Sequence, residues 1–515
     1  MSGVFLLTVS TILCKAIGFF TKVPLMRLLG SAGMGYYHTA YEVYAFLFVL
    51  STAGLPVALS ILICESQGEG ETIWRRANKL FLGFGVAGSL ALSLFARPIA
   101  VLMGNGHAAY SLLAISPSVL FACICASVRG YYQGFQNMKP TAVSQVIEAF
   151  GKFAFGVLFA TLAVRAGWTN ELAAAAGSLG ISAGMGASAL YLMLSKTHVR
   201  KAAEARYDAA YKPVRHVLRP LLRLAIPMTL SSGVLTLTRL LDMVLILRRL
   251  RVLGLSEAYV NTLYGTYATL DLPLYSLLPM LIGSLALPLV PGIAGARERG
   301  DLQEERRVAG LSMKLTLLLS VPSALGLSVF ASPVLTFLFR GQEQAILIGA
   351  PLLSVLALSV PAGCFVTVTG AMLQAYRQPK LPIAAMFLGG ALKLVSAFFL
   401  VGSTRYGMFG APLSTLFCNS FIVLLQLLFL RPFRDGWRMD IKFPAKVILS
   451  SVVCVGSAAL CYRWLSGIVS ANVSFLISFF ACVLLYAIFC FFLGLCREVR
   501  ELRTEMPEGR KKRIK

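Results

Sequence analysis

Long runs of apolar residues, separated by short polar connections, follow one another along most of the chain. The first run begins at Val4 and the last ends near Cys496. Each run holds about 18 or more residues, enough to cross the apolar core of a bilayer as a helix. Gly and Pro are tolerated inside such spans because neighbouring helices satisfy the backbone groups that they free. Hydropathy therefore predicts an all-α polytopic membrane protein with about fourteen spans, at 3–25, 35–64, 79–103, 108–132, 141–166, 172–195, 217–247, 259–292, 309–338, 345–373, 380–402, 407–430, 443–466 and 472–496.

Composition agrees with this pattern. Of 515 residues, 57% are apolar and only 13% are charged, whereas a soluble protein carries about 25% charged residues. The net charge of +25 would suit a nucleic-acid partner, but 31 of the 47 Lys and Arg residues lie in the connections of one side and in the tail. By the positive-inside rule, this asymmetry predicts that both termini are cytoplasmic. We expect no nucleic-acid partner, and the basic tail 497–515 either rests near anionic membrane lipid or stays solvated.

The sequence lacks the motifs of covalent chemistry. Its four His residues are far apart, its 11 Cys residues are scattered, and it has no Walker lysine loop, no H-E-x-x-H and no nucleophile elbow. We therefore expect no enzyme activity, no metal site and no cofactor.

The chain contains a weak internal repeat. Phe95-Ala-Arg-Pro-Ile99 recurs as Phe330-Ala-Ser-Pro-Val334, and Lys139 and Lys152 recur in the same order as Lys380 and Lys393. Six spans separate the equivalent helices, so the two halves have the same orientation. The repeat therefore predicts two parallel six-helix lobes with a substrate cleft between them. Because both lobes belong to one chain, we expect the protein to function as a monomer. The expected divisions are an N-lobe at 1–195, a basic linker at 196–216, a C-lobe at 217–430, two further helices at 431–496 and a basic tail at 497–515.

Ionisable residues inside the spans are candidates for function, because each costs about 2.5–3.5 kcal/mol to place there. Glu148 and Lys152 are four residues apart and could pair on one helix face, either structurally or as substrate contacts. Arg129 is expected to reach the membrane interface. The full set is Lys15, Lys22, Glu42, Arg129, Glu148, Lys152, Arg239, Asp242, Asp271 and Lys393.

Lys15 and Lys22 lie on one face of the first span because seven residues make two helical turns. That span has no acid, so its cations favour an anion such as a phosphate or diphosphate, which Lys and Arg bind through charge-assisted hydrogen bonds. Glu42 and Asp271 could instead pair with these cations across helices and hold a resting conformation.

Two classes of transporter fit the spans. A flippase or exporter of an anionic, lipid-linked substrate predicts cations in the early spans, as observed. A cation-coupled multidrug antiporter predicts an unpaired acid there, and only Glu42 could serve. The pattern favours the anionic substrate, with the antiporter as the alternative.

Six stretches of the chain carry a family resemblance: Lys15–Leu25, Leu29–Tyr36, Ser51–Pro56, the stretch from Asp242 to Pro291, Leu373–Ala375 and Pro379–Pro382. They resemble the stage V sporulation protein B and polysaccharide-biosynthesis membrane proteins. These are relatives of the MurJ-type lipid II flippases within the multidrug, oligosaccharidyl-lipid and polysaccharide exporters. The resemblance implies a fourteen-helix fold with two six-helix lobes, in which the last two helices form a groove for a lipid tail.

The resemblance also implies a substrate, a lipid-linked sugar diphosphate carried on undecaprenyl across the bacterial plasma membrane, in peptidoglycan, polysaccharide or spore-wall synthesis. Lys15 matches an arginine of the flippase pattern in the first span, and the next arginine falls on Thr21, one residue before Lys22. The arginines of the second and eighth spans have no counterpart near Phe48 or Thr269, which fits the sporulation and polysaccharide branch better.

The resulting hypothesis is alternating access without covalent chemistry. The diphosphate is held by Lys15 and Lys22, assisted by Arg239 and Lys393. Membrane potential, worth about 2.3 kcal/mol per charge per 100 mV, is one energy source. Sodium or proton coupling would need an acid, and the candidates are Glu42, Asp242 and Asp271.

Overall fold

The computed structural model describes residues 2–66, 70–204, 218–286, 289–433 and 442–495. Within these ranges the chain is helical and contains no strand. The helices are α1 (Ser2–Thr52), α2 (Leu55–Glu65), α3 (Gly70–Leu94), α4 (Ala96–Leu102), η1 (Gly106–Ala108), α5 (Ala109–Ile115), α6 (Pro117–Gly134), α7 (Lys139–Arg165), α8 (Asn170–Glu204), α9 (Leu218–Val252), α10 (Glu257–Thr266), η2 (Tyr267–Asp271), α11 (Leu272–Ala286), α12 (Leu289–Glu298), α13 (Leu302–Val329), α14 (Ala331–Leu338), α15 (Glu343–Ala357), α16 (Val360–Ala375), α17 (Lys380–Val401), η3 (Gly407–Phe409), α18 (Gly410–Leu430), η4 (Arg431–Phe433), α19 (Lys442–Leu465) and α20 (Ala471–Phe492).

The predicted fold class is confirmed. In the described ranges, 11 helical segments are long and apolar enough to span a membrane, or 12 when the bent pair α15 and α16 is one span. One of these segments, Val9–Glu65, is 57 residues long and contains both the first and the second predicted span. The predicted eighth span corresponds to α10, η2 and α11, which are individually short. The predicted number of fourteen is consistent with this arrangement.

Gly30 divides α1 into two helical segments. Its φ of 64° and ψ of 178° interrupt an otherwise continuous helix. An L-residue with a side chain is strained in this region of backbone space, whereas glycine adopts it freely. The sequence predicted a connecting loop at 26–34 between two spans. In the structure these residues are helical, and the helix is interrupted at Gly30 alone.

By packing, the chain divides into two compact units, Met1–Thr269 and Leu270–Lys515. The six-helix lobes inferred from the repeat stay a prediction, and α9 and α10, which that prediction assigns to the second lobe, pack against α1 in the first unit. The helix α8 runs to Glu204 and so includes the start of the predicted linker 196–216. The basic tail 497–515 lies outside the described residues.

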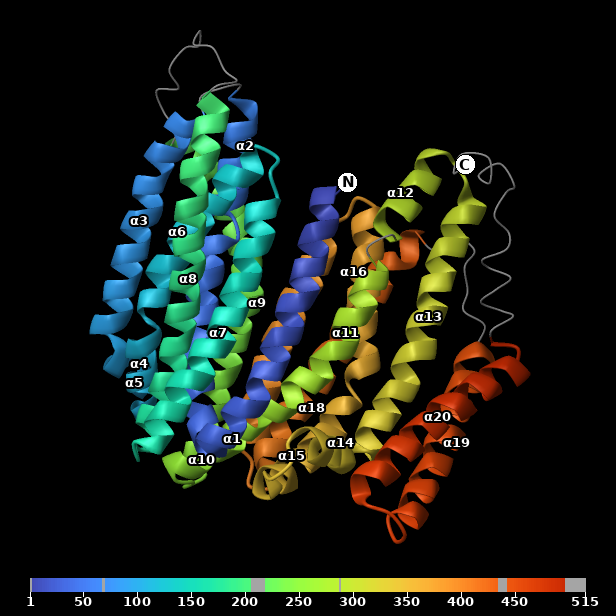
Figure 1. The fold of residues 1–515 in the computed structure, drawn as a ribbon. Helices are drawn as coiled ribbons and strands as arrows, with labels where there is room; N and C mark the ends of the chain where they lie inside the picture. The colour runs from blue at the N-terminus through green and yellow to red at the C-terminus, as the bar shows by residue number, and fades with distance from the viewer. Residues whose placement is uncertain (1, 67–69, 205–217, 287–288, 434–441, 496–515) are drawn as a thin grey trace. The chain divides into compact units, whose positions relative to one another are not determined.

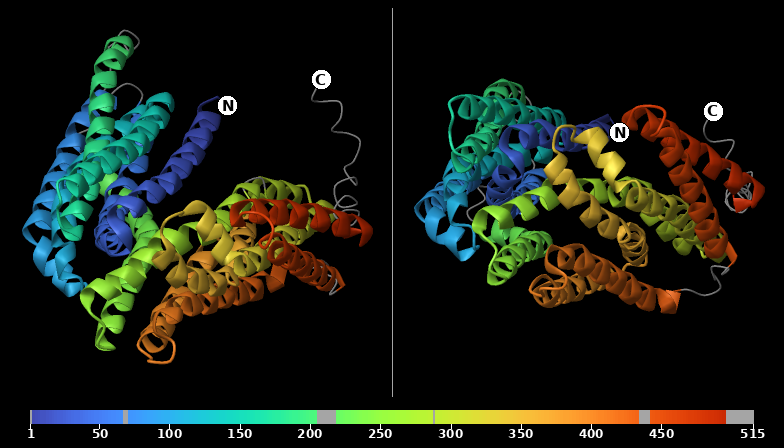
Figure 2. Two further views of the ribbon diagram at one scale, coloured as in Figure 1. Left: turned by 60° about the horizontal axis from the view of Figure 1, so that its bottom comes forward. Right: turned by 90° about the horizontal axis from the view of Figure 1, so that it is seen from below.

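The first unit is a bundle of helices that run side by side along much of their length (Figure 1) and are seen from below in Figure 2. The pair α7 and α8 packs through small residues. A Cβ added at Gly151 would lie 2.8 Å from the Cα of Gly184, and one at Gly180 would meet the backbone of Gly156. Small residues at such positions let the helix backbones approach closely.

The second unit contains α11 to α20. Its core lies between α11, α13 and α16, around residues such as Met313, Cys364 and Met372. The last two long helices, α19 and α20, form a hairpin that packs on α13 and α14 (Figure 1).

Candidate functional site

Lys22 of α1 lies beside the π-helical turn η2. Its ammonium donates a hydrogen bond to the carbonyl oxygen of Ala268, with a distance of 3.0 Å. A π-helical turn departs from the regular α-helical hydrogen-bond ladder, and such turns are frequent at functional sites. Next to this carbonyl, Thr269 Oγ1 lies 3.1 Å from Nε2 of His38, another α1 residue. Both segments of α1 therefore contact this turn.

Two of the candidate acids lie near Lys22 in the first unit. Glu42, on α1 beyond the Gly30 break, interacts electrostatically with Lys22. It also acts on Tyr264 of α10, and so does Asp242 of α9. Glu42 of α1 and Asp242 of α9 thus both lie near Tyr264 of α10. The sequence predicted that Glu42 could pair with a cation of the first span across helices, and this pairing stays a prediction.

The other two candidate cations of the first unit are exposed. Lys15 lies on α1 two turns before Lys22, and Arg239 lies on α9 three residues before Asp242. Arg239 is exposed while Asp242 is buried, with 8% of its surface accessible. Lys15 and Arg239 are thus exposed, whereas Lys22 is half-buried.

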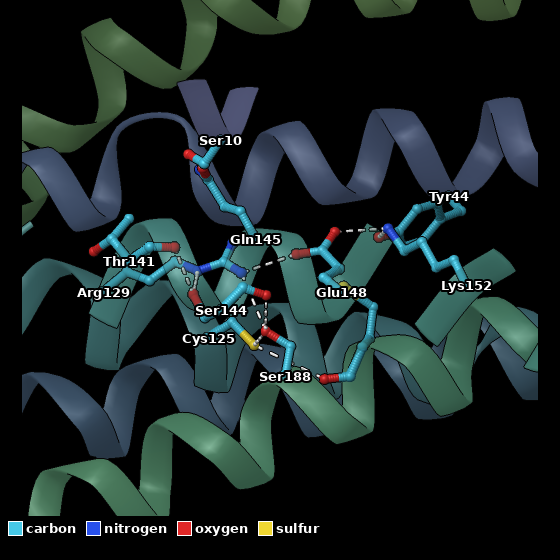
Figure 3. A network of polar contacts seen from close by, with 11 residues as sticks. Ser10, Tyr44, Cys125, Arg129, Thr141, Ser144, Gln145, Glu148, Lys152 and Ser188 are labelled. Carbon is cyan, nitrogen blue, oxygen red and sulfur yellow. Dashed lines mark hydrogen bonds and ion pairs between the residues drawn. The ribbon is translucent and has the colours of Figure 1, made fainter. Parts of the chain in front are cut away.

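A buried ionic network lies between α6, α7, α8 and α1 (Figure 3). Nη2 of Arg129 lies 2.9 Å from Oε2 of Glu148, whose Oε1 lies 2.7 Å from Nζ of Lys152. The Arg129 guanidinium also donates to the hydroxyls of Ser144 and Ser188, at 2.9 and 3.2 Å. Two cations thus share one carboxylate, so the network carries one positive charge in excess.

The position of Arg129 differs from the sequence prediction, which placed its head group at the membrane interface. In the structure the residue is 8% exposed and its guanidinium is directed into the network (Figure 3). The partners explain the difference, because a carboxylate and two hydroxyls satisfy its donors inside the bundle. A carboxylate in the next span was the signal in the sequence that could have indicated this pairing.

Aromatic rings extend the network along α1. Nζ of Lys152 donates to the hydroxyl of Tyr44 at 3.3 Å and lies 5.7 Å from the ring centre of Phe48. Towards the Gly30 break, the rings of Tyr41 and Tyr37 continue this row, with centroids 6.3 Å apart and nearly parallel planes. Rings over a cation add cation–π attraction. The row connects the ionic network to the part of α1 that carries His38 and Glu42.

Asparagine residues join α1, α10 and the segment before η1 at the end of the first unit. Nδ2 of Asn105 lies 2.7 Å from Oδ1 of Asn261, and Nδ2 of Asn261 lies 3.1 Å from Oδ1 of Asn105. Asn105 also donates to Thr39 of α1 at 2.8 Å. A Cβ at Gly35 or Gly265 would clash with the opposite helix. This end of the first unit is therefore closely packed.

In the second unit, Lys393 of α17 is half-buried and acts electrostatically on Tyr275 of α11. The Tyr275 hydroxyl accepts a hydrogen bond from Nδ2 of Asn419, at 2.6 Å. Asp271, the last residue of η2, is fully buried. Each unit thus holds part of the predicted residue set, and the joint site that the sequence predicted for them stays a prediction.

A helical membrane protein with paired and half-paired charges inside its helices is typical of a transporter rather than of a structural membrane anchor. The chain matches the model of the polysaccharide biosynthesis protein family over residues 1–295. It therefore belongs to this family, as the motifs of the sequence indicated.

Relatives and solved structures agree with this assignment. Stage V sporulation protein B of Bacillus subtilis (strain 168) is 27% identical, over 83% of this chain and 82% of the relative. Lipid II flippase MurJ of the same organism is 24% identical, over 77% of this chain and 76% of the relative.

The fold is similar to that of lipid II flippase MurJ in an inward closed conformation, with a TM-score of 0.75 at 19% identity, covering 97% of this chain and 100% of that one. An inward-facing multidrug resistance MATE family transporter of the MOP superfamily has a TM-score of 0.66 at 14% identity, covering 81% of this chain and 94% of that one. Family and fold together define a multi-pass membrane protein of the flippase and exporter class.

Proposed function

We propose that this protein is an alternating-access flippase that moves an undecaprenyl-diphosphate-linked oligosaccharide, a precursor of peptidoglycan or of another polysaccharide, across the bacterial plasma membrane. The observation that carries the proposal is the excess of cations within the spans of the first unit. Among the candidate residues in these spans, five are cations, including Lys15 and Lys22, and three are carboxylates, those of Glu42, Glu148 and Asp242. An uncompensated positive charge in a membrane interior is costly, and an anionic diphosphate offsets that cost.

Lys15 and Lys22 have different roles in this proposal. Lys15 is exposed and serves as the first contact for the diphosphate. Lys22 is half-buried, and its ammonium has one hydrogen bond to the Ala268 carbonyl and two further donors. It can therefore bind a phosphate oxygen without leaving η2. Arg239 and Lys393 stay candidates for further contacts with the diphosphate.

The packed end of the first unit supports an inward-loading transporter. In the proposed topology, the segment of Asn105 and the start of α10 face the outside. The paired amides of Asn105 and Asn261 and the close approach of Gly35 to α10 then close the outer end. A head group would enter from the cytoplasm, and separation of α10 from α1 would release it outside.

The test is flipping of a fluorescent undecaprenyl-diphosphate-linked sugar in proteoliposomes, measured by quenching of the label in the outer leaflet. We expect flipping by the wild type and its loss in Lys15→Ala/Lys22→Ala. Lys15→Arg/Lys22→Arg should retain part of it because the charge remains. The matched control is Lys139→Ala/Lys380→Ala, which removes two exposed lysines at the first residues of α7 and α17 and should flip normally.

Efflux of a cationic dye is measured in the same vesicles to separate the two transporter classes. No lipid flipping, together with dye efflux driven by an ion gradient, would overturn the proposal in favour of the multidrug antiporter. If the Lys15→Ala/Lys22→Ala variant still flips the lipid, these two lysines do not bind the diphosphate.

A further inference from the structure

Asp271 is a buried acidic residue that takes no part in the proposed binding of the diphosphate. It ends the π-helical turn η2, and its side chain is 0% exposed. Both of its carboxyl oxygens are buried and have no hydrogen-bond partner within the described ranges, a combination that no other carboxyl group there shares.

The polar groups of the neighbouring turn residues Ala268 and Thr269 have hydrogen-bond partners. The carbonyl of Ala268 accepts a hydrogen bond from Lys22, and the hydroxyl of Thr269 lies within hydrogen-bond distance of His38. Asp271, two residues further along, is the polar group of this turn that is left without such a contact in the described part of the chain.

The helices packed around Asp271 do not compensate a negative charge. Its continuation α11 packs on α12, α13, α15 and α16. In the described part of the chain, no side chain of these helices donates a hydrogen bond to the Asp271 carboxyl. The titratable groups of these helices and of α11 are Tyr275, Arg297, Glu298, Glu304, Glu305, Arg306, Arg307, Lys314, Glu343 and Cys364.

An ionised carboxylate without a cation or a hydrogen-bond donor is strongly disfavoured in an apolar interior, and the group neutralises instead. A proton removes the charge without any other ligand. A sodium ion would need several oxygen ligands around it, and the described residues hold no group of three or more His, Cys, Asp and Glu side chains that could bind a metal ion. A proton needs no further ligand, and a sodium gradient is therefore one arm of the test below.

The backbone at Asp271 is suited to a change of environment. A π-helical turn inside a membrane helix interrupts the regular ladder between α10 and α11, so a shift of α10 during transport would be absorbed at η2. We propose that Asp271 is a proton-binding site that is loaded in this conformation and exchanges its proton with water when the π turn rearranges. The inference rests on the proposed transport function and adds its coupling ion.

The first test measures the proton itself and does not depend on transport. Infrared spectra of the purified protein at neutral pH should contain the carbonyl band of a protonated carboxylic acid, and Asp271→Asn should lack it. The matched control Asp301→Asn should retain the band. Asp301 is an exposed helix N-cap that accepts a hydrogen bond from the Glu304 amide at 3.0 Å, and Asn serves equally well there. An identical spectrum for Asp271→Asn would overturn the inference.

The second test asks whether the proton drives transport. With one coupled proton, a gradient of about one pH unit shifts the distribution of labelled undecaprenyl-diphosphate sugar between the leaflets about tenfold. We expect this shift in the wild type and in Asp301→Asn. Asp271→Asn should flip the lipid at equal rates with and without the gradient, since Asn mimics the protonated acid permanently.

The outcomes separate this inference from the proposed function. Lipid flipping with the same pH response in Asp271→Asn and the wild type overturns the proton site and leaves the flippase intact. The proton site is also overturned if a sodium gradient drives flipping in the wild type and in Asp301→Asn but not in Asp271→Asn. If no vesicle flips the lipid, the proposed function fails, and the infrared comparison still decides whether Asp271 holds a proton.

Discussion

Replacing Glu148 with Gln should destabilise the protein more than removing either of its cationic partners. Gln has nearly the shape of Glu but no charge, so the change leaves Arg129 and Lys152 buried together without a counterion. At the observed separations of 2.9 and 2.7 Å, each ion pair is worth about 6 kcal/mol in gross Coulomb energy at an effective dielectric constant of about 20.

The net cost is smaller than the gross energy, because the wild type has already desolvated all three groups. Breaking a buried pair by removing one partner costs about 3–5 kcal/mol, and the side chains of Arg129 and Glu148 are only 10% and 11% exposed, so solvent screens them little. Lys152→Met should cost less than Glu148→Gln, because it leaves one neutral pair between Arg129 and Glu148.

The assay is thermal unfolding in detergent, followed with a thiol-reactive fluorophore. Cys125 is buried beside the network, with its Sγ 3.7 Å from the Ser188 hydroxyl, and becomes reactive on unfolding. At about 2 °C per kcal/mol, Glu148→Gln should lower the apparent melting temperature by roughly 6–10 °C.

The matched control is Glu298→Gln. Glu298 forms an ion pair with Arg377 at 2.6 Å, but the two side chains are 65% and 79% exposed, and such pairs contribute about 0–1 kcal/mol. Equal shifts for Glu148→Gln and Glu298→Gln, or a larger shift for Lys152→Met than for Glu148→Gln, would refute this account of the network.

Two further predictions concern the topology and the break in α1. A variant that retains only Cys64, which is exposed at the end of α2, should react with a membrane-impermeant maleimide in inverted vesicles and not in intact cells, and the reverse result would contradict the predicted cytoplasmic face. Gly30→Ala should cost about 1–3 kcal/mol in thermal unfolding because φ is 64° there. Gly18→Ala, at a helical position of α1 that is equally free of neighbours, should be neutral or stabilising, and equal effects of the two would exclude backbone strain.

The sequence predicts the spans well because hydropathy is a property of each segment alone. The predicted ranges 141–166, 380–402 and 407–430 differ from α7, α17 and α18 by a few residues at most. The break in α1 was harder to predict from the sequence, because nine residues between two apolar runs suggested a connecting loop. The backbone conformation at Gly30 shows instead that a single residue interrupts the helix.

The partners of the buried charges could be predicted only where they lie on one helix. The spacing of Glu148 and Lys152 predicted their pairing correctly, because residues four apart share a helix face. The pairing of Arg129 with Glu148 depends on how α6 and α7 pack, and the hydrogen bond of Lys22 depends on a π turn more than 240 residues away in sequence. Tertiary packing decides both, and neither has a spacing signature.

The helix α1 connects the charged groups of the first unit to one another. Before Gly30, Ser10 contacts Gln145 of α7 and Lys22 contacts η2. After Gly30, Tyr44 contacts Lys152 of α7 at 3.3 Å, and His38 contacts η2 at Thr269. Both segments of α1 thus contact α7 and η2. If the angle between the two segments changes at Gly30, the contacts of Lys22 and His38 with η2 can both persist only if the turn itself rearranges. A ligand that draws Lys22 away from Ala268 would therefore act on the π turn directly. This gives the proposed flippase a physical route by which diphosphate binding changes the turn that carries Asp271.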